Sequence, residues 1–158
     1  MVETSNYVRK SKLFKGQFLH SIDSKGRLSI PARLRKSVLQ EADNSFVMTL
    51  GIGKCIEVYP KDQWELIEAK LLKLNFFDPT EARLLRIMLQ NANEDTMDAQ
   101  SRILIPQSLL DYAGIKSEVK IIGILKKIEL WEPETYEAYM ASSPETFEQI
   151  ASQVMRME

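Results

Sequence analysis

A short segment in which one basic residue lies on each side of a glycine is the part of the chain best suited to chemistry. It reads Asp23-Ser24-Lys25-Gly26-Arg27 and is followed by Leu-Ser-Ile-Pro. An aspartate at the start of a turn accepts hydrogen bonds from the backbone two residues on, and a glycine supplies a positive φ at no steric cost. The pattern predicts a tight hairpin turn that presents Lys25 and Arg27.

A hairpin turn with these side chains is suited to binding DNA, because a two-stranded ribbon fits the major groove. Lys25 offers a point charge to phosphate, whereas Arg27 carries a planar fork of five donors for guanine edges or phosphate. Arg33 and Arg35 begin a predicted helix and are expected to hold flanking phosphates. The alternative is an ordinary exposed hairpin in which Arg27 pairs with a nearby carboxylate.

The same segment recurs in the second half of the chain. Asp98-Ala-Gln-Ser-Arg102 is followed by Ile-Leu-Ile-Pro, so Asp, Arg, Ile and Pro occupy the same places in both copies. The second copy has Gln100 in place of Lys25 and Ser101 in place of Gly26, and it keeps Arg102. We expect the first turn to dominate binding and Arg102 to assist.

The charge distribution supports this assignment. Residues 7–37 contain nine basic residues and a single acid, which gives +8, and the total of −1 leaves −9 for the rest of the chain. Such asymmetry indicates that one end of the molecule faces a polyanion. A solvated charged surface would show the same pattern.

The elements that must position these residues follow from hydrophobic periodicity and turn signals. The sequence predicts strands or hairpins over 14–22, 27–30, 45–50, 55–59, 118–124 and 127–131. Helices are predicted over 32–39 with Pro31 in the first turn, 62–73, 79–91, after Pro106 to about Gly114, 133–140 and 144–156. Two short units of this kind are expected to pack face to face about a pseudo-twofold axis, and the fold class is α+β.

Several functions are excluded by what the sequence lacks. No apolar run approaches the roughly 18 residues of a membrane span, and the basic, polar N-terminus is unlike a secretory signal. His20 and Cys55 are the only histidine and cysteine, so they form neither a structural zinc site nor an oriented catalytic pair. A single cysteine also fits a reducing cytoplasm. The chain is expected not to be an enzyme, and no cofactor, metal or small-molecule substrate is implied.

The paired motifs and the spacing between them resemble those of the MraZ family of bacterial transcriptional regulators, from about Leu13 to Tyr139. The resemblance implies two swapped-hairpin β modules with flanking helices, like those of the AbrB and MazE DNA-binding families. It also implies a ring-forming homo-oligomer that binds direct repeats in double-stranded DNA upstream of its own division and cell-wall operon. Such a regulator would lie in the cytoplasm, associated with the nucleoid.

Site residues carry over from the family motif by position. The resemblance implies that Lys25 and Arg27 are the principal DNA contacts, with Arg102 as their counterpart and Arg33 and Arg35 as further basic positions. Asp23, Gly26 and Asp98 would shape the turns. Ser101 stands where the family has glycine, which leaves open whether the second loop adopts the same turn.

The predicted organisation has five parts: a basic N-terminal extension (1–12), a first module (13–75), a connecting helix (76–91), a second module (92–140) and a C-terminal helix (141–158). Apolar residues of the C-terminal region are expected to dock onto a neighbouring subunit, namely Met140, Phe147, Ile150, Val154 and Met157.

Two other functions stay open. One is a protein-interaction module that inhibits a partner enzyme, with the basic loops bound to acidic side chains. The other is an AbrB-like antitoxin, against which the helical, partly apolar C-terminus counts, because such antitoxins wrap their toxins with disordered tails.

Overall fold

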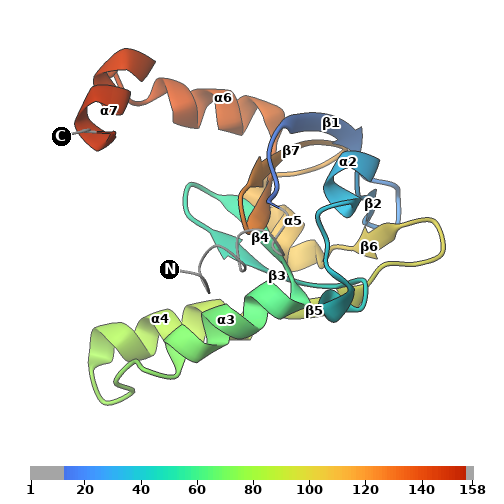
Figure 1. Cartoon of the computed structure of the whole chain (residues 1–158), viewed down its shortest axis with the longest axis horizontal. Helices are drawn as coiled ribbons and strands as arrows, with labels where there is room; N and C mark the ends of the chain where they lie inside the picture. The colour runs from blue at the N-terminus through green and yellow to red at the C-terminus, as the bar shows by residue number, and fades with distance from the viewer. Residues whose placement is uncertain (1–12, 156–158) are drawn as a thin grey trace, which may run out of the picture.

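A computed structural model describes residues 13–155, so the N-terminal extension and Met157 lie outside the described part. The fold is α+β, as the sequence predicts, with one six-stranded antiparallel sheet, a separate two-stranded ribbon and helices around them (Figure 1). The strands are β1 (Gln17–Ser21), β2 (Arg27–Ser29), β3 (Ser45–Gly51), β4 (Cys55–Pro60), β5 (Asn93–Thr96), β6 (Arg102–Leu104), β7 (Glu118–Ile124) and β8 (Lys127–Trp131). Of these, β5 and β6 are not among the strands predicted from the hydrophobic pattern. The residues of β5, Asn-Glu-Asp-Thr, are all polar, and β6 has only three residues.

The two halves of the chain are joined within the sheet, whose strand order is β1-β7-β8-β4-β3-β5. The first strand of each half pairs with a strand of the other half, since β1 pairs with β7 and β5 pairs with β3. The central pair, β4 with β8, and the ribbon, β2 with β6, also join the halves. The prediction of two units packed face to face is therefore wrong in its geometry, because backbone hydrogen bonds between the halves form one continuous sheet.

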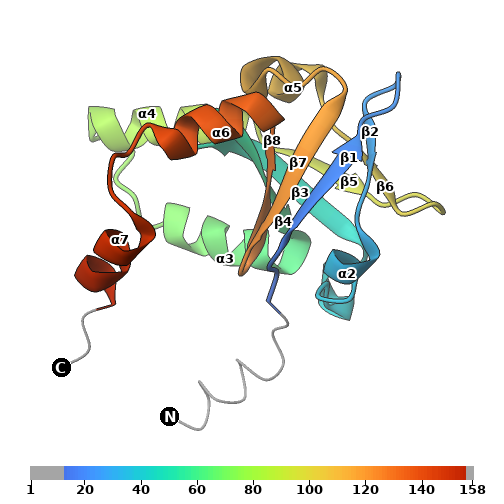
Figure 2. The same cartoon turned by 90° about the horizontal axis from the view of Figure 1, so that it is seen from above.

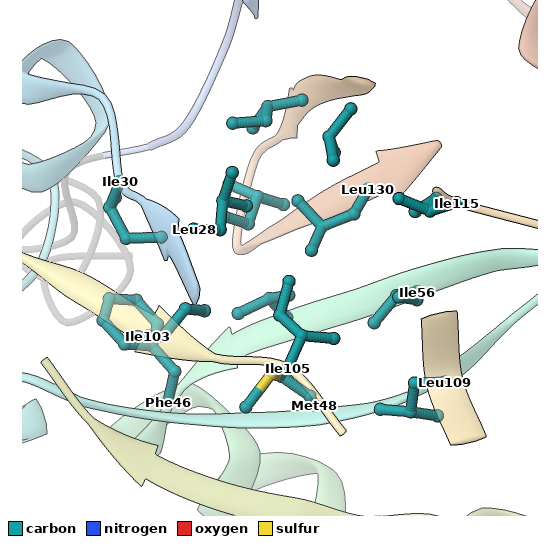
Figure 3. Packing of buried hydrophobic residues seen from close by; sticks show 14 of the residues in the cluster. Leu28, Ile30, Phe46, Met48, Ile56, Ile103, Ile105, Leu109, Ile115 and Leu130 are labelled. Atoms are coloured by element: carbon teal, nitrogen blue, oxygen red, sulfur yellow. The ribbon is translucent and has the colours of Figure 1, made fainter. Parts of the chain in front are cut away.

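The core lies between the six-stranded sheet and the ribbon (Figure 3). Leu28 of β2 and Ile103 of β6 are fully buried, and Met48, Ile56 and Leu130 of the sheet belong to the same cluster. Both repeats supply this core, so neither half can bury its apolar side chains alone. The alternation of buried and exposed residues in β2 and β6 leaves the flanking side chains free to face outward.

The helices are α2 (Ala32–Arg35), α3 (Lys61–Leu71), α4 (Pro79–Gln90), α5 (Gln107–Ala113), α6 (Pro133–Ala141) and α7 (Phe147–Val154), with a 3₁₀ turn, η1 (Gln40–Ala42). The prediction for 32–39 is too long, because α2 ends after one turn and Pro31 precedes it as the N-cap. The start of α4 is confirmed: the Asp78 side chain accepts a hydrogen bond from the Glu81 N–H at 2.9 Å, and Pro79 opens the helix.

The helices α3 and α6 follow the paired strands β4 and β8 and pack on the sheet through equivalent aromatic pairs. Tyr59 contacts Trp64 with ring centroids 5.7 Å apart, and Trp131 contacts Tyr136 at 5.2 Å. Between them Lys127 binds Glu57, and Tyr59 donates a hydrogen bond to the other oxygen of Glu57. Both carboxylate oxygens of Glu57 thus have a partner within this half-buried network, which indicates a structural role.

Two of the apolar surfaces that remain exposed on the described part of the chain lie on the helices. An apolar groove of about 460 Å³ lies between α3 and α4, lined by Glu68, Leu71, Leu72, Leu74, Leu85 and Leu89. The second surface is the amphipathic α7, which projects away from the sheet in both views (Figures 1 and 2). None of the helices in residues 13–155 is long and apolar enough to cross a membrane.

Candidate nucleic-acid interface

The first loop, residues 23–26, is a tight turn organised by the carboxylate of Asp23. Its Oδ1 accepts hydrogen bonds from the backbone N–H groups of Lys25 and Arg27, both at 2.9 Å. Gly26 has φ +84° and donates its N–H to the Asp23 carbonyl oxygen at 3.0 Å. A built Cβ on Gly26 would lie 3.2 Å from the carbonyl oxygen of Ile105, so both the backbone angle and the available space favour glycine here.

The side chain of Arg27 is held against this turn. Its Nε donates to Asp23 Oδ2 at 2.8 Å, so the pairing with a carboxylate that the sequence leaves as an alternative is present. The contact uses the inner nitrogen, and no acceptor within residues 13–155 pairs with Nη1 or Nη2. Arg27 is therefore oriented by Asp23 while the outer end of its guanidinium keeps its donors for a ligand.

The second loop, residues 98–101, adopts the same turn, which settles the question left open by Ser101. Asp98 Oδ1 accepts from the N–H groups of Gln100 and Arg102 at 2.9 Å, and its Oδ2 accepts from Arg102 Nε at 2.9 Å. Ser101 takes the place of glycine with φ +60°. The hydrogen bonds of the aspartate, which both copies share, are sufficient to close the turn around a serine in a left-handed conformation.

The ribbon β2·β6 brings the two loops together. The last residue of each loop accepts a hydrogen bond from the residue just after the ribbon strand of the other repeat. The Ile30 N–H donates to the Ser101 carbonyl at 3.0 Å, and the Ile105 N–H donates to the Gly26 carbonyl at 2.9 Å. Arg102 Nη1 lies 3.8 Å from Asp23 Oδ2, so Asp23 is close to the arginines of both copies. Figure 2 shows the two loops projecting from the same end of the molecule.

The electrostatics of the two loops differ. Hydrogen bonds from the backbone N–H groups of Arg27 and Arg102 hold the pKa values of Asp23 and Asp98 below the usual aspartate value, so both are carboxylates at neutral pH. Each carboxylate balances one arginine. The first loop then has the exposed Lys25 as a surplus cation, whereas the second has the neutral Gln100.

Arg33 and Arg35 do not flank the first loop, with which the sequence groups them. They lie on α2, which begins two residues after Ile30, and Ile30 is bonded to the second loop. The Arg33 guanidinium lies 5.7 Å from the centre of the Phe18 ring and is exposed. Arg35 is half-buried, and its Nη1 donates to the Ile30 carbonyl at 3.3 Å. Arg33 is thus available to a ligand, and Arg35 also fixes the end of β2.

Two residues that could suggest catalysis have structural surroundings instead. His20 lies on β1 opposite Val119, and Cys55 is fully buried. Burial raises the pKa of the Cys55 thiol to about 12, so it stays protonated and unreactive. Among the described residues, no group of histidine, cysteine and acidic side chains could hold a metal ion.

Comparison with known proteins decides the family. The family described as "MraZ protein, putative antitoxin-like" matches the chain twice, over residues 13–87 and 88–157. The chain belongs to the MraZ family. The two matches correspond to the two copies of the turn motif, so the resemblance and the internal repeat that the sequence indicates are both confirmed.

MraZ proteins of several bacteria align with most of the chain. The "Transcriptional regulator MraZ" of Natranaerobius thermophilus is 38% identical over 90% of this chain and 97% of its own length. The proteins of the same name from Shewanella amazonensis and Clostridium tetani are 40% and 35% identical, over 83% and 92% of this chain and 87% and 99% of theirs. These MraZ relatives are named as regulators, not as enzymes.

Proposed function

We propose that this protein is a transcriptional regulator that binds specific DNA sequences through its two hairpin loops. The observation that carries the proposal is the repeated turn, in which an aspartate orients an arginine at the same position in both copies. An arginine held in one orientation loses little side-chain entropy on binding, so its outer nitrogens are suited to reading guanine edges. Relatives named as transcriptional regulators support the assignment.

Five residues make the DNA contacts of the proposed interface. Lys25 and Arg27 are the principal contacts, since the first loop has the surplus positive charge. Arg102 makes the equivalent contact from the second loop, and Arg33 and Arg35 contribute phosphate contacts from α2. The pairing of strands across the repeats supports two swapped-hairpin modules within one chain, which act together as one DNA-binding unit.

We further propose that the protein works as a ring-like homo-oligomer on direct repeats upstream of its own division and cell-wall operon, in the cytoplasm at the nucleoid. A few cationic contacts bind weakly, so several subunits aligned on repeated sites would gain avidity of roughly 10²–10⁴. The exposed surfaces support self-assembly: α7 leaves Phe147 79% and Val154 73% exposed, and Leu72 in the α3–α4 groove is 85% exposed.

The apolar character of both surfaces favours a second copy as the occupant of the groove. The groove is lined by leucines apart from Glu68, and α7 exposes Phe147 and Val154. The apolar side of α7 of one subunit therefore matches the apolar groove of the next. Because this contact joins two different surfaces, it generates rings or open chains and not closed pairs.

The deciding experiment compares binding to the protein's own upstream DNA and to scrambled DNA at roughly 150 mM salt. Wild type is expected to bind its own upstream DNA selectively, and Arg27→Ala is expected to lose that selectivity while keeping its fold. Lys54→Asn is the matched control, because Lys54 is an exposed cation with φ +68° in the distant β3–β4 turn and asparagine tolerates that conformation. Equal binding of both DNAs by wild type would favour the protein-interaction module instead.

A further inference from the structure

A cationic cavity lies beside α2, apart from the tips of the two hairpin loops. Its volume is about 260 Å³, and it is lined by Leu13, Lys15, Arg33, Leu34, Lys36 and Ser37. Three of these six residues are basic and none is acidic. Lys15 and Lys36 were not among the candidate site residues from the sequence, because they are 21 positions apart and no motif links them.

The fold fixes these three cations next to one another. Ser37 Oγ donates a hydrogen bond to the Leu13 carbonyl at 3.4 Å, which ties the segment before β1 to the end of α2. The Arg33 guanidinium rests over the Phe18 ring of β1, 5.7 Å from its centre. Leu34 between them is buried in the core. The cluster therefore stands on ordered elements, with its charged groups at the surface.

No carboxylate neutralises this cluster within the described part of the chain. None of the ion pairs among residues 13–155 includes Lys15, Arg33 or Lys36. Cation–π contact holds Arg33 in place but leaves its charge. Three neighbouring cations without a partner repel one another, so the site gains most from an anion that bridges them.

The cluster lies on the side of the second loop because the chain crosses over in the ribbon. Ile30, at the end of β2, bonds the Ser101 carbonyl of the second loop, and α2 starts two residues later. In the symmetric position α5 follows Ile105, and Leu110 of α5 lies against Gly26 of the first loop. Figures 1 and 2 both place α2 at the same end of the molecule as the loops.

We propose that Lys15, Arg33 and Lys36 form a phosphate-binding surface that holds the DNA backbone beside the second loop. The proposal rests on the function proposed above. The second loop offers Arg102 as its one cation, next to the carboxylates of Asp95 and Asp98, and the first loop offers two. The α2 cluster supplies the positive charge that the second loop lacks, so that both halves of the interface attract the same duplex.

Phosphate contacts carry no base information, which gives this surface a signature different from that of Arg27. Each phosphate contact contributes about 0.9 to the slope of log affinity against log salt concentration. The double variant Lys15→Ala/Lys36→Ala is therefore expected to flatten this slope by roughly 1.8 per bound subunit. Its preference for the upstream sequence over scrambled DNA is expected to stay at the wild-type ratio.

The experiment measures binding of wild type, the double variant and the Lys54→Asn control to both DNAs over a range of salt concentrations, with assembly size followed by light scattering. A flatter slope in the double variant alone, at unchanged assembly size, supports the surface. A slope equal to that of wild type overturns it. A smaller assembly with an unchanged slope also overturns it, because the cluster would then bind the acidic arm of a neighbouring subunit.

The same data separate this inference from the proposed function. If wild type binds both DNAs equally, the sequence-specific function fails, and the slopes on scrambled DNA still decide whether the cluster binds phosphate. Lys36→Ala alone, which changes one exposed side chain on a single turn, repeats the test should the double variant be unstable.

Discussion

At the scale of single residues, each hairpin loop depends on one aspartate that performs two tasks. Its Oδ1 closes the turn by accepting two backbone N–H groups, and its Oδ2 orients the arginine. This double use explains why aspartate occurs in both copies while the residues between it and the arginine differ. A shorter or longer side chain could not reach the backbone and the guanidinium together.

Titration of Asp23 by NMR of its carboxyl carbon should give a pKa below 3.8, the ordinary aspartate value. The backbone N–H of Arg27 is the main cause, with the Arg27 side chain and the Lys25 N–H adding to it and partial desolvation opposing it. Since the folded pKa is the lower one, the turn's stabilisation is complete above the unfolded value and is lost as the pH falls through the folded value.

Arg27→Ala should raise the pKa of Asp23 only part of the way, because the backbone donors remain. Asp98 in the same variant serves as the internal control and should keep its lowered pKa. A pKa of Asp23 at or above 3.8 in wild type would contradict the hydrogen bonds of the first loop.

Exchanging the residue types at the fourth position of the two turns, Gly26 and Ser101, should change stability in opposite directions. Ser101→Gly should stabilise the protein by about 0.5–1 kcal/mol, because glycine adopts the positive φ without steric cost. Gly26→Ser should destabilise it by about 1–2 kcal/mol, since a Cβ there also approaches the Ile105 carbonyl. Chemical denaturation measures both, and a stabilising effect of Gly26→Ser would show that the two turns are not equivalent.

At the scale of elements, the ribbon β2·β6 is the support of the interface. It has only three residues in each strand, too few for stability by backbone pairing alone. Its central residues Leu28 and Ile103 are both fully buried in the shared core (Figure 3). The core therefore holds the ribbon rigid, and the ribbon in turn fixes the distance between the two loops.

Ile103→Ala should destabilise the protein by about 2–5 kcal/mol, because it removes a fully buried side chain and leaves a cavity. Leu104→Ala is the matched control on the same strand. Leu104 is 48% exposed, so its truncation should cost less than about 0.5 kcal/mol. Equal effects of the two variants in thermal unfolding would contradict the burial of the ribbon.

At the scale of the whole molecule, the cationic surface lies at one end and the exposed apolar surface of α7 lies at the other. The loops and α2 lie at one end, and α6 and α7 extend from the other (Figure 2). An acidic C-terminal arm would repel DNA at the loop end, and its distance from the loops avoids this. The same separation leaves the arm free to contact a neighbouring subunit while the loops face DNA.

Leu72→Glu should reduce assembly size in sedimentation velocity, since it places a charge in the apolar groove proposed to receive the apolar side of α7. The fold should be unaffected because Leu72 is 85% exposed. Ile52→Glu is the control, because Ile52 is equally exposed but lies in the β3–β4 turn. Assembly reduced to the same extent by both variants, or by neither, would remove the groove from the proposed ring contact.

The sequence by itself determined the local features of this protein. Asp23, Gly26 and Pro31 predicted the first turn, whereas Ser101 left the second turn open. Hydrophobic spacing predicted most strands and helices, because these depend on neighbouring residues. The repeated motif also predicted the family. The length of α2 was overestimated, because the sequence after Pro31 continues with residues that favour a helix, whereas the chain after Arg35 continues in tighter turns, in which the Ser37 and Val38 N–H groups donate to the Leu34 and Arg35 carbonyls.

The tertiary structure alone decided which distant residues meet. The pairing of β1 with β7 and of β2 with β6 depends on a core supplied by both repeats, and no local pattern encodes that exchange. For the same reason the sequence grouped Arg33 with the first loop, although the crossing of the ribbon places it beside the second. Lys15 and Lys36 become neighbours only because the segment before β1 packs against α2.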